Sequence, residues 1–186
     1  MTLELSSLAA EPDRLDLRLM APEVTDPNVP YGWFASETAP AALMPVVLGR
    51  LDNWRFYLDL AATPDLFTIT GPSAAVRRQA RSVARQLADA GVSVTIIGDV
   101  LGPEVPTGYR QLAAFPELAS FGPTSGPEVV ISGPVRGAEL TAARGLVART
   151  QSRVVPVLIG EVLRARWSVQ VSPVPADTAV SGELAR

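Results

Sequence analysis

The sequence predicts an α/β fold: a mostly parallel, Rossmann- or P-loop-like sheet of four to five strands, flanked by helices and preceded by an N-terminal β-hairpin. The first indication is a strand-helix-strand run over residues 66–98, which is typical of a right-handed crossover between parallel strands. The second is a run of the same order over residues 128–159. The third is that several of these strands are almost wholly apolar, as in sheets covered on both faces.

The composition limits the chemistry that the chain can perform. It has 186 residues, enough for one domain, and contains no Cys, no His and no Lys, so that all 16 basic residues are Arg. Without these side chains the usual transition-metal ligands, imidazole acid–base catalysis, thiol chemistry and Schiff bases are excluded. We therefore expect a protein that is not an enzyme and that binds neither a metal nor a cofactor.

Charge and hydropathy indicate the class of partner. The net charge of −3 and the pI near 5.0 argue against a nucleic-acid-binding protein. No apolar run approaches the ~18 residues of a membrane span, and the acidic N-terminus is not a secretory signal. We expect a cytoplasmic protein with protein partners and at most peripheral contact with the inner membrane.

Residues 1–45 are the least regular part, and we expect them to form a Pro-rich N-terminal arm. An alternating stretch, residues 15–19, predicts a short strand, and the five prolines that follow favour extended backbone. Residues 46–172 would form the α/β domain and residues 173–186 a C-terminal tail. The domain opens with a hairpin of residues 46–51 and 54–60 around Asp52-Asn53.

The core begins with a buried-type strand over residues 66–70. Ser73 is expected to be the N-cap of a helix over residues 74–90, which Gly91 ends, before a strand over residues 92–97. A long link follows, with a short helix over residues 109–114.

Three more strands and a second helix complete the predicted core. Residues 128–132 and 154–159 predict strands on either side of a helix over residues 138–149. Pro156 would make the second of these an edge strand or a loop, because proline lacks an amide donor. The alternating residues 167–171 predict the last strand.

The turn after the first core strand stands where a phosphate-binding loop would be. In the pattern G-x-x-x-x-G-K-[ST], glycine amides, a lysine and a hydroxyl converge on phosphates and magnesium. Here only the first glycine, Gly71, remains; Arg77 and Arg78 replace the lysine and the hydroxyl residue, and Pro72 removes an amide. No carboxylate ends the third core strand, where a magnesium ligand would stand. We therefore do not expect nucleotide hydrolysis.

The alternative is a Rossmann-like protein that binds a nucleotide or another small anion at the turn of residues 71–73. Gly71, Ser73 and Arg77 would meet the anion at the start of the helix, and Asp99 would hydrogen-bond a ribose. The glycine-rich dinucleotide fingerprint is missing, however, and a solvated or turn-capping role for Asp99 is the simpler interpretation.

Two groups of residues are candidates for binding a partner. The first is an arginine stripe on one face of the predicted helix: Arg77, Arg78, Arg81 and Arg85. It is either a solvated face or a contact for an acidic partner or anionic lipid headgroups. The second is a set of aromatic residues in the Pro-rich arm: Tyr31, Trp33 and Phe34. They either pin the arm to the domain or dock on a partner. A homo-oligomer with a structural task is a further alternative.

One stretch, residues 44–72 (MPVVLGRLDNWRFYLDLAATPDLFTITGP), resembles the hairpin, turn and strand that lead into the P-loop of FtsK/SpoIIIE-type ATPases. These include the EccC ATPase of actinobacterial type VII (ESX) secretion. The layout through residue 173 also resembles the C-terminal half of EccE, another component of that system, with its LGR hairpin, Ala/Arg-rich helix and RW…V…P ending.

The resemblance implies a structural component of a type VII secretion apparatus, with a degenerate nucleotide-binding fold and other subunits of the machinery as partners. No catalytic residue is carried over, because the residues that define the ATPases are absent. The chain departs from EccE in one respect: EccE members carry N-terminal membrane helices, whereas this sequence contains no apolar run of that length.

Overall fold

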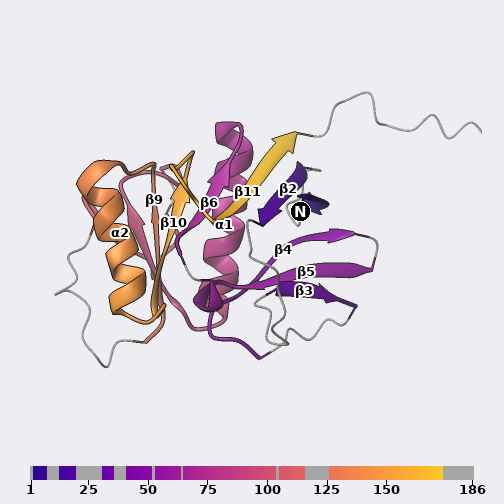
Figure 1. Ribbon diagram of the computed structural model, residues 1–186, viewed down its shortest axis with the longest axis horizontal. Helices are drawn as coiled ribbons and strands as arrows, with labels where there is room; N and C mark the ends of the chain where they lie inside the picture. Colours follow the sequence, from indigo (N-terminus) through magenta and orange to yellow (C-terminus); the bar gives the residue numbers. More distant parts are fainter. Residues whose placement is uncertain are drawn as a thin grey trace, which may run out of the picture.

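The computed structural model describes residues 2–7, 13–19, 31–35, 41–51, 53–63, 65–103, 105–115 and 126–173. Parallel strands form its centre (Figure 1). They are β6 (Phe67–Thr70), β7 (Ser93–Ile97), β8 (Arg110–Leu112), β9 (Glu128–Ser132), β10 (Val154–Ile159) and β11 (Trp167–Pro173). Their spatial order is β11-β6-β10-β9-β7-β8. The predicted α/β class is confirmed, and β8 brings the parallel strands to six in place of the four to five expected.

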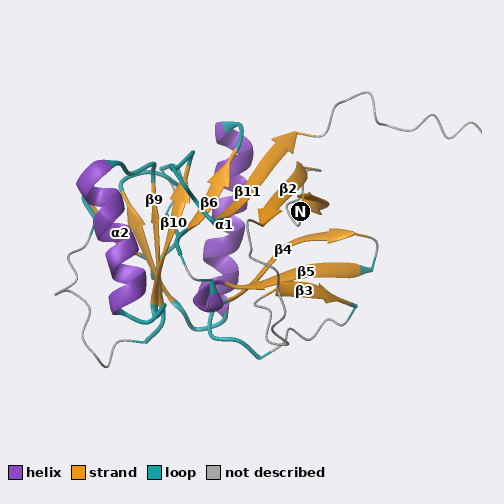
Figure 2. Ribbon diagram, viewed as in Figure 1, coloured by secondary structure: helices purple, strands orange, loops and turns teal. Residues whose placement is uncertain are grey.

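Two helices cover opposite faces of these strands (Figure 2). Helix α1 (Ser73–Asp89) packs on the face that carries Val129 and Ile131 of β9, and α2 (Gly137–Arg149) packs on the face that carries Val130. Because successive side chains of a strand point to opposite faces, a wholly apolar strand serves both helices. The predicted core strands and both helices all occur, with ends that differ from the predicted ones by at most two residues.

Antiparallel strands extend the sheet beyond β11. Their bounds are β1 (Thr2–Ser7), β2 (Asp13–Leu19), β3 (Tyr31–Phe34), β4 (Pro45–Leu51) and β5 (Trp54–Asp59), and a 3-10 turn, η1 (Leu60–Ala62), follows β5. The pairing of β4 with β5 confirms the predicted hairpin, and β3 adds a strand to β5. β2 contains the predicted strand of residues 15–19 and pairs with β11. The described parts of residues 1–45 thus include three strands.

The hairpin of β4 and β5 covers α1 on a second side. β4 has an irregular register between Val47 and Gly49, and such a bulge leaves backbone groups outside the ladder. The Val47 N–H donates to Gln86 Oε1 at 2.7 Å, and Gln86 Nε2 donates to the Val47 carbonyl at 3.0 Å. Gln79, which is buried, donates to the Leu48 carbonyl at 3.2 Å. Two glutamines of α1 therefore fix the hairpin to the core.

The start of α1 differs from the prediction, whereas its end agrees with it. Pro72 occupies the N-cap position without a side-chain hydrogen bond, and Ser73, the predicted N-cap, is the first helical residue. A proline at this boundary has the fixed φ that an extended cap residue needs. Gly91 follows the C-cap Ala90 with φ +82°, as expected of a glycine that ends a helix.

Two other predictions are wrong because strand pairing outweighs the local signal. The short helix predicted over residues 109–114 is the edge strand β8, which pairs with β7. The expected demotion of residues 154–159 does not occur: β10 lies between β6 and β9, and Pro156 is buried. The pairing of β10 with β6 begins only at Val157, one residue after Pro156. The amide that proline lacks is therefore not needed for this pairing, which limits the loss of stability. Residues 174–186 of the predicted tail lie outside the described residues.

Candidate functional site

The turn after β6 is packed against a neighbouring strand. Gly71 has φ +132°, in a region open almost only to glycine. A Cβ atom at this position would stand 2.0 Å from the carbonyl oxygen of Val171 in β11. The one glycine that the phosphate-loop pattern retains is therefore required by the contact with β11. Ser73 and Arg77 are exposed in the first turns of α1.

Asp99 lies far from this turn. β7, which it follows, is separated from β6 by β10 and β9. The two strands are thus three strand spacings, about 14 Å, apart. Asp99 is exposed, and its carbonyl accepts a hydrogen bond from the Gly102 N–H at 2.6 Å in a local turn. The structure does not bring Asp99 together with Gly71, Ser73 and Arg77, the other residues of the alternative nucleotide site.

The members of the arginine stripe have different surroundings. Arg77 is exposed, and Arg78 is half-buried. The Arg81 Nε–H donates to the Leu101 carbonyl at 2.7 Å, which ties α1 to the loop after β7. Arg81 and Arg85 also border a hollow of about 280 Å³ under that loop. Two of the four arginines therefore face a loop of their own chain, and one of them is bonded to it.

Tyr109 closes the same hollow from the loop side. Burial raises the pKa of its hydroxyl above the ordinary value, while Arg85 lowers it and Asp89 raises it. The hydroxyl consequently stays neutral at physiological pH.

The aromatic residues of β3 pack on the protein's own core. All three are half-buried. Ring centroids lie 5.3–6.0 Å apart in four pairs: Tyr31–Phe56, Tyr31–Trp167, Trp33–Phe56 and Phe34–Tyr57. These are ordinary distances for interacting aromatic rings. Such packing pins this segment to the domain, in accord with the first of the two interpretations given above.

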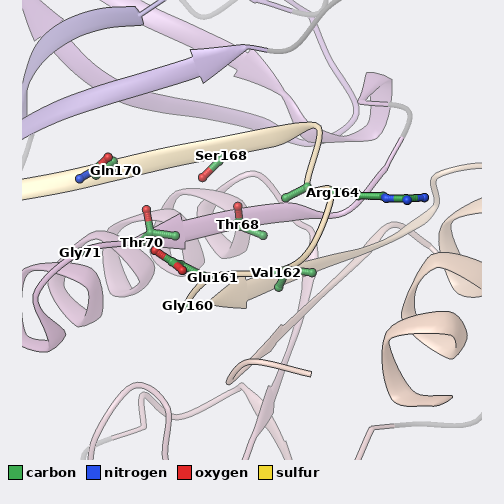
Figure 3. Close-up of a pocket in the computed structure, with 10 residues that line it drawn as sticks. Thr68, Thr70, Gly71, Gly160, Glu161, Val162, Arg164, Ser168 and Gln170 are labelled. Atoms are coloured by element: carbon green, nitrogen blue, oxygen red, sulfur yellow. The ribbon is translucent and has the colours of Figure 1, made fainter. Parts of the chain in front are cut away.

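A polar groove that the sequence did not predict lies between β6, β11 and the connection from β10 to β11 (Figure 3). Two polar side chains from each strand line it, Thr68 and Thr70 from β6 and Ser168 and Gln170 from β11, and its volume is about 640 Å³. The Thr68 hydroxyl donates to the Trp167 carbonyl at 3.1 Å, which leaves its lone pairs able to accept. The groove can offer hydrogen bonds to a ligand from two adjacent strands.

The groove exists because residues 160–166 join β10 to β11 without a helix. Parallel strands are usually joined by a dozen or more residues, most often helical, that cover the sheet. In Figure 3 the Glu161 side chain runs toward Thr70 and Gly71, and the Arg164 guanidinium points away from the groove. The available signal was the alternation over residues 167–171, which indicates a strand with one polar face.

Two buried polar groups lie elsewhere. The Tyr57 hydroxyl is buried and has no hydrogen-bond partner among the described residues. Its burial, and then the Asp59 carboxylate, raise the pKa of Tyr57 to about 12. Glu128 accepts a hydrogen bond from Thr95 Oγ1 at 2.5 Å and lies 3.9 Å from Arg110. Neither group lines the groove, so we assign both to the packing of the sheet.

Comparisons of the chain with protein families, with curated proteins and with solved structures found no match. In the part of the chain that the structure describes, no helix is both long enough and apolar enough to cross a membrane.

Proposed function

We propose that the protein is a non-catalytic scaffold or partner-binding domain of a type VII (ESX-like) secretion apparatus, built on a degenerate nucleotide-binding fold. The observation that carries this proposal is the contact between Gly71 and Val171. In a phosphate-binding loop, glycine lets backbone amides approach a phosphate; here it lets β11 approach. The Glu161 carboxylate beside the turn adds negative charge where a phosphate would have to lie.

The strand order favours this proposal over the dinucleotide-binding alternative. In the doubly wound sheets that bind dinucleotides, the first two strands are neighbours, and an acid after the second reaches the ribose. Here β10 and β9 lie between β6 and β7. The carboxylate of Asp99 is thus on the wrong part of the sheet for a ligand held at Gly71.

As partners we propose other subunits of the secretion machinery, bound in the cytoplasm or at the inner membrane surface through the arginine stripe. Arg77, the first residue of the stripe, is exposed and does not line the hollow under the loop after β7. An arginine face on a protein of net charge −3 suits an acidic partner.

Calorimetry and a turnover assay test the absence of catalysis. The full chain should show no micromolar binding of ATP, ADP or NAD, with or without magnesium, and no release of phosphate from ATP. Saturable binding of magnesium-ATP, or turnover that scales with protein concentration, would overturn the proposal.

Co-purification with an EccC-type ATPase and with an EccE-type protein tests the partner. We expect a complex on size-exclusion chromatography with light scattering, weakened by Arg77→Glu. The matched control is Arg136→Glu, which makes the same charge change at the exposed start of α2. Arg81 is left unchanged, because it holds the Leu101 carbonyl. A stable homo-oligomer that ignores both partners would instead favour the purely structural alternative.

A further inference from the structure

A second hollow lies on the other side of the connection between β10 and β11, against α2. Its volume is about 370 Å³, and five residues line it: Asp65, Arg144, Ala148, Arg164 and Arg166. One of the three arginines, Arg144, comes from α2, and the other two come from the connection between β10 and β11. Two segments therefore bring three arginine residues to one small space, which we call the arginine hollow.

Arg144 gives the arginine hollow its shape. Its Nε lies 3.4 Å from the carboxylate of Asp65, and its Nη2 donates to the carbonyls of Leu163 at 2.9 Å and Arg164 at 3.1 Å. Arg164 has φ +57°, in the left-handed region that disfavours residues with a Cβ atom. The bonds from Arg144 thus help to hold Arg164 in a conformation that it would seldom adopt alone.

The charges of the arginine hollow are not balanced. Asp65 is the one carboxylate that lines it, and Asp65 is already paired with Arg144. Arg164 and Arg166 are exposed, and neither forms an ion pair among the described residues. Like charges gathered at one site repel, and an anion that enters relieves the repulsion. Guanidinium groups offer paired donors that match the oxygens of a phosphate.

We propose that the arginine hollow binds a phosphate-class oxyanion, supplied either as a free ion or as the headgroup of an anionic phospholipid. Leu163 precedes Arg164 and is 83% exposed, so it stands where an apolar side chain could enter a lipid surface beside the headgroup. The inference is independent of the proposed function, since it uses neither the turn after β6 nor the arginine stripe.

Calorimetry with pyrophosphate tests the free-ion source on the full chain. Arg166→Gln and Arg164→Gly each remove one cation, and each should weaken binding about tenfold. Glycine at position 164 also accepts the left-handed backbone, so that variant should melt no lower than the wild type. Arg50→Gln, the matched control, removes the same charge from an exposed position of β4 and should leave the affinity unchanged.

Flotation with vesicles of phosphatidylglycerol and phosphatidylcholine tests the lipid source. Leu163→Ser should reduce vesicle binding but not pyrophosphate binding if the headgroup is the ligand. Binding to either probe that falls in Arg166→Gln and Arg164→Gly, and not in Arg50→Gln, supports the proposal. It is overturned if the wild type binds neither probe, or if the control variant weakens binding as much as the other two.

Discussion

Replacing Gly71 by alanine should destabilise the fold far more than a surface substitution does. The new Cβ would stand 2.0 Å from the carbonyl oxygen of Val171, and Cβ atoms essentially never approach another heavy atom within 3.0 Å. The end of β6 and the end of β11 would therefore have to separate by at least the difference, 1.0 Å. Their ladder runs to Thr70 and Gln170, immediately beside this contact, so the separation would strain it.

The expected loss in the free energy of unfolding has three contributions. The backbone conformation at Gly71 costs a residue with a Cβ about 1–2 kcal/mol. Overpacking against Val171 costs about 1–3 kcal/mol, and a lost ladder hydrogen bond about 1 kcal/mol. The total, about 3–6 kcal/mol, is a large part of the 5–15 kcal/mol that is typical of a folded domain.

Urea unfolding of the two alanine variants Gly71→Ala and Gly91→Ala measures the packing terms. Gly91 also has positive φ, +82°, but no atom lies within 4 Å of its Cβ position. Gly91→Ala should therefore lose only the backbone term, about 1 kcal/mol. Equal losses in the two variants would refute the reasoning. So would a Gly71→Ala protein of normal stability that has lost affinity for a nucleotide, because the glycine would then serve a ligand.

Three further predictions concern polar side chains that are buried or half-buried. Tyr57→Phe should stabilise the protein by up to about 1 kcal/mol at pH 7, since the hydroxyl has no partner among the described residues. Because the pKa of Tyr57 rises from 10.0 to about 12 on folding, wild-type stability should fall as the pH rises through this window; urea unfolding at pH 8–12 should show a smaller fall in the variant. Gln86→Ala should cost about 1–3 kcal/mol and speed hydrogen exchange of the Val47 amide, which would otherwise stay protected by the side chain. Arg144→Ala should cost about 1–2 kcal/mol in the same unfolding assay, because the Asp65 carboxylate loses its ion-pair partner, and the double variant with Asp65→Asn should recover part of the loss.

The elements of the parallel core could be predicted from the sequence because each has its own periodicity. β9 and β10 are apolar runs that face both helices, and α1 has an apolar face that ends at Gly91. β8 could not be predicted, since three residues at a sheet edge carry no periodic signal and depend on pairing with β7. Pro156 can lie in a strand inside the sheet because the neighbouring strand β6 begins to pair only at Val157, and the local sequence does not show where that pairing begins.

The candidate site was less predictable, because it depends on which strands are neighbours. A helical crossover fixes the direction of the next strand but not how many strands it passes over, so Asp99 could be assigned to a site with Gly71 although two strands lie between β6 and β7. Arg81 and Gln86 illustrate the same limit. Their partners, the Leu101 carbonyl and the backbone of Val47, are set by tertiary packing and leave no mark in the local sequence.

The polar groove lies where a parallel sheet of this kind would be expected to bind a ligand. A crevice opens at the carboxyl ends of two adjacent strands whose connections leave toward opposite faces. β6 leads into α1, and β10 leads into residues 160–166, which pack through Val162 on the face that α2 covers. One end of the groove, at Gly71, Gly160 and Glu161, therefore lies at such a position, but Val171 fills the space beside Gly71 and Glu161 brings negative charge. These contents favour neutral hydrogen-bonding groups over phosphates, which is why the phosphate site that we propose is the arginine hollow beside α2 and not this groove.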